Sequence, residues 1–192
     1  ILIGRDQTGM NKNRLEAFSD AIIAIAATIM VLELHIPKLN NLSGLWEEWP
    51  VFLAYFISFT LIYAVWYNHH NLFKKANYIS KQTYILNGIW VFLLTLVPFT
   101  SNWVGRSPNN SLPEIIFALV LILWSVMFQV LDQQVLKDNP QAEKDPTTRF
   151  GYRTILYGGY IVALILAFTI PIYCLLMLGF ISVSMMVRMF LD

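Results

Sequence analysis

The amino-acid sequence predicts an all-α integral membrane protein with six transmembrane helices. Hydrophobic residues make up 57% of its 192 residues and charged residues only 13%, whereas soluble domains carry about a quarter charged residues. The charges gather between long apolar stretches, several of which reach the roughly 20 residues that a helix needs to cross the hydrocarbon core. A soluble domain of this size could not cover so much apolar surface.

The six predicted spans are separated by polar or proline-containing segments. Their bounds are 18–36, 50–72, 84–103, 113–131, 151–170 and 171–191. Pro37 is expected to end the first span, because proline disfavours helix in the residue before it. Pro50 and Pro113 are expected in first helical turns, where proline is tolerated. The polar stretch 137–149 is expected to be a loop.

Two further prolines bear on the spans. Pro171 predicts a tight turn between the last two spans, and the alternative is one kinked, steeply tilted helix. Pro98 lies inside the third span and predicts a kink, with Thr95 or Thr100 available to satisfy the freed carbonyl.

The basic residues predict the orientation of the chain in the membrane. Cytoplasmic loops carry an excess of lysine and arginine, and only Lys38 and Arg106 of the 13 basic residues lie in one set of predicted loops. The other set holds Arg5, Lys12, Arg14, Lys74, Lys75, Lys81, Lys137, Lys144, Arg149, Arg153 and Arg188. Both termini are therefore predicted to be cytoplasmic. We expect a cytoplasmic segment over residues 1–13 and a single membrane domain over 14–192.

The first span carries a stripe of residues with the period of a packed helix. Ala21, Ile25, Thr28 and Leu32 are spaced 4, 3 and 4 residues apart, so they share one face. One interpretation is an ordinary seam between two helices, where small residues permit close approach. The other is a pore surrounded by several copies of this helix, in which Ile25 and Leu32 form hydrophobic constrictions that gate by dewetting.

Polar residues near the predicted cytoplasmic side form a second candidate site. Asp20 is either a first-turn carboxylate that the helix dipole stabilises or a buried partner for other polar side chains. The candidates for such a partner are Arg14, His69, His70 and Asn87. Adjacent histidines point about 100° apart on a helix, and no third ligand is evident, so we expect no metal site.

The motifs that are missing from the sequence exclude several classes of protein. It contains no nucleotide-binding loop, zinc signature or nucleophile elbow, and it lacks the Thr-Val-Gly-Tyr-Gly potassium filter. We expect no cofactor and no nucleic-acid partner. On these residues alone, a channel, a transporter, a scaffold subunit and, least favoured, a membrane-embedded enzyme remain open.

The run Arg14-x-x-x-Phe18-Ser19-Asp20 resembles the first-helix signature of the lysosomal potassium channel family called transmembrane protein 175. The apolar run that follows it, His69-His70-x-Leu72-Phe73, and Asn87 followed by 96–99 are also similar to that family. The likeness covers the layout of all six spans, and about the first hundred residues in detail.

This resemblance implies a potassium-permeable channel that has no filter loop. Ile25 matches the hydrophobic constriction, Thr28 a position associated with selectivity, and Leu32 the next pore-facing position; Ala21 and Ile29 would complete the pore lining. The polar cluster that braces the pore helix would comprise Arg14, Phe18, Ser19, Asp20, His69 or His70, and Asn87. A single six-helix repeat resembles the bacterial type, which implies a homotetramer around a central pore in a bacterial plasma membrane, with potassium as the permeant ion.

Overall fold

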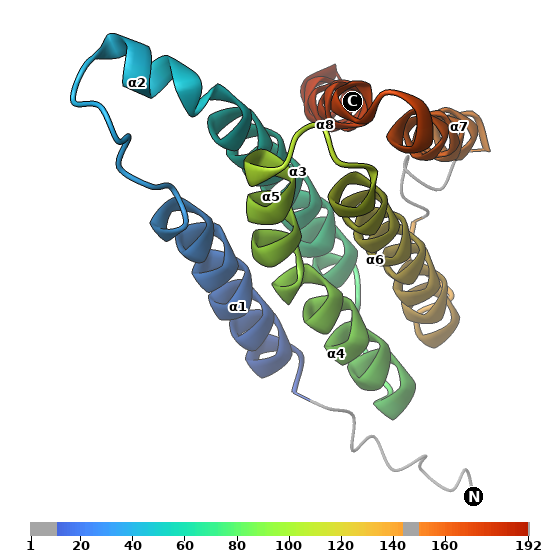
Figure 1. Ribbon diagram of the computed structural model, residues 1–192. Helices are drawn as coiled ribbons and strands as arrows, with labels where there is room; N and C mark the ends of the chain where they lie inside the picture. Colours follow the sequence, from blue (N-terminus) through green and yellow to red (C-terminus); the bar gives the residue numbers. More distant parts are fainter. Residues whose placement is uncertain (1–10, 144–149, 192) are drawn as a thin grey trace, which may run out of the picture.

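The computed structural model describes residues 11–143 and 150–191, and every regular element in these ranges is a helix. The helices are α1 (Lys12–Leu32), α2 (Leu42–Glu47), α3 (Trp49–Lys74), α4 (Lys81–Thr95), α5 (Val97–Arg106), α6 (Ser111–Asp138), α7 (Phe150–Thr169) and α8 (Pro171–Leu191). Figure 1 shows α1 at one edge of the bundle beside α3, α4 and α5, with α7 and α8 together at the opposite side, where α8 packs against α3 and α7 against α6.

Four helical segments are long and apolar enough to cross a membrane. They are Lys12–Leu32, Trp49–Lys74, Lys81–Arg106 and Ser111–Asp138. The apolar stretches Arg153–Thr169 and Pro171–Val187 are shorter. The all-helical class is therefore confirmed, whereas a count of six spans stays a prediction.

The third predicted span is broken at Pro98, as expected. α4 ends at Thr95, and α5 begins at Val97 with Pro98 in its first turn. The Thr95 hydroxyl donates to the Phe92 carbonyl, and the Thr100 hydroxyl to the carbonyls of Leu96 and Val97. Thr100 thus satisfies backbone acceptors at the break itself.

The last two apolar stretches form separate helices that pack side by side. α7 ends at Thr169 and α8 begins at Pro171. A methyl group on Gly159 of α7 would lie 2.9 Å from Ile181 Cδ1 of α8. Residues on the two sides of Pro171 therefore face each other across a turn, and the alternative of one kinked helix is wrong.

The C-terminal ends of α1 and α6 differ most from the predicted bounds. α1 ends at Leu32 rather than at Ile36, five residues before Pro37. The next residue contacts α5, where Asn102 Nδ2 donates to Glu33 Oε2 at 2.7 Å. Pro37 therefore does not end the helix. α6 continues to Asp138, so Lys137 lies in a helix and not in a loop. Arg5, Lys144 and Arg149 lie outside the described residues.

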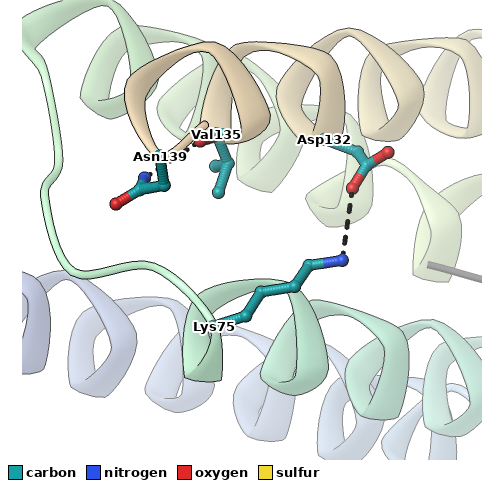
Figure 2. A network of polar contacts seen from close by, with 4 residues as sticks. All are labelled: Lys75, Asp132, Val135 and Asn139. Carbon is teal, nitrogen blue, oxygen red and sulfur yellow. Dashed lines mark hydrogen bonds and ion pairs between the residues drawn. The ribbon is translucent and has the colours of Figure 1, made fainter. Parts of the chain in front are cut away.

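One end of the bundle gathers the start of α1, the end of α3, the start of α4 and the end of α6. Lys12 Nζ donates to the carbonyls of Phe73 and Ala76 at 3.1 and 3.0 Å. This places a cation where the helix dipole of α3 is negative. Lys75 at the end of α3 pairs with Asp132 of α6 at 3.8 Å (Figure 2).

Asn139 fixes the α3–α4 loop to the end of α6. Its Oδ1 accepts from the backbone amides of Asn77 and Tyr78, both at 2.8 Å, and its Nδ2 donates to the carbonyls of Tyr78 and Val135. Figure 2 shows Asn139 and Val135 on the same helix, one turn apart. The Asn139 amide group thus joins the short α3–α4 loop to α6, beside the bond from Ser80 N to Asp138 Oδ2.

Small residues bring α5 close to α3. Ser58 Oγ donates to Ser101 Oγ at 2.8 Å, and Ser101 Oγ donates to the Ala54 carbonyl at 3.1 Å. A Cβ added to Gly105 would lie only 2.7 Å from Val51 Cα. Glycine is therefore required at position 105 by the approach of two backbones, as is common between membrane helices.

We expect Gly105→Ala to lower the free energy of unfolding by about 1–3 kcal/mol, the usual cost of overpacking a tight contact. Gly88→Ala is the matched control, because nothing lies within 4 Å of a Cβ at that helical position. Alanine there should be neutral or stabilising by up to about 1 kcal/mol. Thermal unfolding of both variants in detergent measures the difference, and equal stabilities would contradict the close contact at Gly105.

Candidate functional site

α1 has one face packed into the core and one face that no other described part of the chain covers. The buried face consists of Leu15, Ser19, Ile23, Ala26 and Met30. On the uncovered face, Ile25 is 56% exposed and Leu32 is 79% exposed. Ala21, Thr28 and Ile29 are exposed as well. The five residues predicted to line a pore thus lie together on the uncovered face.

Thr28 presents its side-chain oxygen as an acceptor. Its hydroxyl donates to the Ile25 carbonyl at 2.8 Å, so its proton is already used within the helix. The lone pairs of a hydroxyl oxygen can accept from water or coordinate a cation. This position therefore offers an oxygen ligand in an otherwise apolar stripe.

A buried chain of hydrogen bonds joins α1 to α4 and α3. Ser19 Oγ donates to the Leu15 carbonyl at 3.0 Å and accepts from Asn87 Nδ2 at 2.9 Å. Asn87 Oδ1 lies 2.8 Å from His69 Nε2. Because Asn87 Oδ1 can only accept, His69 Nε2 is the donor. The structure therefore selects His69, and not His70, for this network.

The His69 ring stacks on an aromatic ring of α4, which stacks in turn on a ring of α6. The His69 ring lies 4.4 Å from that of Trp90 at an interplanar angle of 11°, and Trp90 stacks on Trp124 at 5.6 Å. His69 and Trp90 are both buried. The stack connects the polar network of Ser19, Asn87 and His69 to α6, so α1 is joined to the buried core.

Asp20 is not a buried partner of the predicted candidates. It is exposed, and its Oδ1 accepts from Trp66 Nε1 at 3.0 Å. His70, also exposed, stacks on Trp66 with ring centroids 6.4 Å apart. Since α1 begins at Lys12, Asp20 also lies beyond the first turn, so the helix-dipole interpretation is wrong too.

Arg14 and Phe18 lie on the uncovered side of α1. Both are exposed, and the described bond of Arg14 is from its backbone amide to the capping Asn11 Oδ1. The predicted polar cluster is therefore divided within this chain. Ser19, Asn87 and His69 form the buried network, Asp20 joins Trp66 and His70, and Arg14 and Phe18 face outward.

A second polar chain fixes the other end of α1. Asn102 donates to Glu33, as above, and its Oδ1 accepts from Arg106 Nε at 2.8 Å. The Arg106 guanidinium also contacts the His35 ring. We had not predicted roles for Asn102 or Trp66, because each contacts α1 from a distant part of the sequence and neither belongs to a recognisable spacing.

No group of three or more histidine, cysteine or acidic side chains that could hold a metal ion occurs within 11–143 and 150–191. The chemistry available on the uncovered stripe of α1 is therefore that of the apolar side chains and the Thr28 hydroxyl, with polar networks at both ends of the stripe. A bundle with four helical segments long and apolar enough to span a membrane is typical of a polytopic membrane protein.

Comparisons with known proteins identify the family. A sequence profile of the family described as endosomal/lysosomal potassium channel TMEM175 matches residues 14–98. A protein of Chryseobacterium sp. (strain P1-3) named a potassium channel is 31% identical over 166 residues, which cover 84% of this chain and 85% of that one. The chain therefore belongs to the TMEM175 family, whose members are ion channels and not enzymes.

A solved structure has the same fold. The crystal structure of a lysosomal potassium-selective channel TMEM175 homolog from Chamaesiphon minutus matches with a TM-score of 0.81 at 26% identity, covering 92% of this chain and 97% of that one. An animal relative, the endosomal/lysosomal proton channel TMEM175 of Danio rerio, is 29% identical over 75% of this chain but only 31% of its own length.

Proposed function

We propose that this protein is a subunit of a potassium-permeable channel in which α1 of four copies surrounds a central pore. The observation that carries the proposal is the uncovered face of α1, where the apolar side chains of Ala21, Ile25, Ile29 and Leu32 flank the Thr28 hydroxyl. Membership of a channel family supports it. Potassium is favoured over protons because the relatives of similar length are named potassium channels.

In this proposal the Ile25 side chains form the hydrophobic constriction, and the Leu32 side chains form a second ring at the C-terminal end of α1. An ion that passes a narrow dry neck must lose part of its hydration shell. Potassium holds its water less tightly than sodium, so the same neck admits potassium more readily. The oxygen of Thr28, one turn from Ile25, would replace part of the lost water. No protein cofactor is needed for this passive step.

The proposal includes the arrangement in the membrane. Six spans with both termini in the cytoplasm of a bacterium agree with the distribution of basic residues. Lys12, Lys74, Lys75, Lys81 and Lys137 belong to helix ends that meet at one end of the bundle. That end would face the cytoplasm, so Glu33 and Arg106 would face outside.

The direct test is reconstitution of the purified protein in liposomes, with potassium on one side, sodium on the other and planar patch recording. A current that reverses near the potassium equilibrium potential is the expected result. If protein shown to be folded and tetrameric carries no current, the chain is a transporter or a scaffold with the same fold.

Substitution of Thr28 tests the role of its oxygen. We expect Thr28→Ala to lower the potassium-to-sodium permeability ratio by about fivefold, because a net hydrogen bond is worth about 1 kcal/mol. Thr28→Ser should lower it less. Reversal potentials under bi-ionic conditions give the ratio.

The control for this experiment is Thr169→Ala, because the exposed Thr169 hydroxyl also bonds to a helix carbonyl but lies at the end of α7. It should leave the ratio unchanged. Wild-type selectivity in both Thr28 variants would remove Thr28 from the mechanism.

A further inference from the structure

A cavity of about 230 Å³ lies between α1 and the broken span formed by α4 and α5. Its apolar walls are formed by Ile22, Ile25, Ala26, Ile29, Pro98 and Phe99. Two features of the sequence leave this space open. Ala26 and Pro98 are small residues at buried positions of the two walls, and the helix break at Leu96 interrupts the surface that faces α1.

One end of the cavity is polar and carries a negative charge. Glu33, which follows the last residue of α1, and Asn102 of α5 line this polar end. Ile22, near the middle of α1, lines the apolar part. Eleven residues of helix separate Ile22 from Glu33, which corresponds to roughly 16 Å at 1.5 Å per residue. The cavity is therefore longer than a single side chain and changes from apolar to acidic along its length.

The polar groups of the cavity are oriented by their hydrogen bonds. Asn102 donates to Glu33 Oε2 and accepts from Arg106 Nε, so its amide is oriented toward the carboxylate by both bonds. The Thr95 hydroxyl donates to the Phe92 carbonyl at 2.6 Å and offers no proton to a ligand. The charge of the Glu33 carboxylate is thus the strongest feature available to a molecule in the cavity.

This combination defines the ligand by its chemistry. An apolar cavity of about 150 Å³ lined by leucine, isoleucine and phenylalanine is large enough for benzene, and this cavity is larger. An ammonium group donates up to three hydrogen bonds and pairs strongly with a carboxylate. A neutral hydrocarbon would leave the charge unpaired, and an anion would be repelled by it.

We propose that this cavity is a binding site for small arylalkyl amines, with the ring between α1 and α5 and the ammonium group at Glu33. Because Ile25 and Ile29 belong to its wall, an occupant would contact the same helix that is proposed to line the pore. The binding itself does not depend on conduction.

The test uses the purified full chain in detergent and two probes of equal shape, 2-phenylethylamine and 2-phenylethanol, followed by calorimetry and by saturation-transfer NMR. The amine is expected to bind the wild-type protein at least about tenfold more tightly than the alcohol, because a hydrogen bond to a charged group is the stronger one. Glu33→Gln should remove this difference and leave the binding of the alcohol unchanged.

Two variants test whether the probes bind in this cavity, because each fills it from one of two opposite walls. Ala26→Leu and Thr95→Leu should each lower the affinity for both probes. Thr95 is exposed, so Thr95→Leu keeps the test valid if Ala26→Leu does not fold. Ile161→Leu, at an exposed position of α7, is the control.

Three results would overturn the proposal. They are equal binding of the two probes, full amine affinity in Glu33→Gln, and no saturable binding to folded protein. Neither probe binding while Ala26→Leu and Thr95→Leu lower the oligomer mass measured by light scattering would mean that the cavity is occupied by a neighbouring subunit instead. None of these experiments measures ion flux. The binding proposal can therefore be wrong while the proposed channel function is right.

Discussion

Replacing Ile25 with alanine is expected to raise potassium flux by at least about tenfold and to reduce selectivity. Shortening this side chain in every subunit widens the proposed neck and lets water remain in it. A barrier lower by only about 1.4 kcal/mol accelerates passage tenfold, and four side chains change at once in a tetramer. Potassium efflux from loaded liposomes measures the rate, and bi-ionic reversal potentials measure the selectivity.

Ile161→Ala is the matched control for Ile25→Ala. Ile161 is 60% exposed, against 56% for Ile25, but it lies on α7 and not on α1. It should leave flux and selectivity at wild-type values. Wild-type behaviour of Ile25→Ala, or an equal rise in both variants, would contradict a constriction at Ile25.

Replacing Asn87 with leucine is expected to lower the free energy of unfolding by about 1–4 kcal/mol. Asn87 is 1% exposed and bonds to both Ser19 and His69. Leucine has a similar size but leaves the His69 N–H without an acceptor, and a buried polar group without a partner costs about 1–3 kcal/mol. The lower end of the range allows for the modest hydrogen-bond energies measured inside membranes. Thermal unfolding in detergent measures the effect.

Two comparisons distinguish the stability lost with the hydrogen-bond network from any stability lost when an asparagine is replaced by leucine. Asn109→Leu, at an exposed loop position, should cost much less than Asn87→Leu. The triple variant Ser19→Ala, His69→Phe, Asn87→Leu removes every member of the network. It should regain much of the lost stability, because replacing all partners by apolar groups is nearly neutral. A triple variant less stable than Asn87→Leu alone would count against this account.

The Ile25 and Asn87 variants probe different properties of α1. The Ile25 variant changes the uncovered face and should alter flux at constant stability. The Asn87 variant changes the buried hydrogen-bond network between α1, α4 and α3, and its main effect should be a lower free energy of unfolding. If Asn87→Leu also changes selectivity in the folded fraction, the buried network positions the pore lining as well as stabilising it.

The sequence by itself determined the class of protein and which residues share one face of α1. Apolar stretches of sufficient length demand helices in a membrane, since the backbone must satisfy its own hydrogen bonds there. The helical period then assigns Ala21, Ile25, Thr28 and Leu32 to one side of α1 without any knowledge of its neighbours. The break at Pro98 follows equally from local chemistry, because proline lacks the amide that the helix needs.

Only the tertiary structure decided which polar groups meet. Adjacent histidines differ by a rotation of about 100°, and which one faces Asn87 depends on how α3 is turned toward α4; the structure selects His69. The same holds for Asp20, which bonds to Trp66 and to none of the four expected partners. Likewise, the contact of Glu33 with Asn102 joins α1 to α5 across 69 positions of sequence. Local sequence sets the periodicity of a helix, whereas its rotation and its partners depend on packing against distant residues.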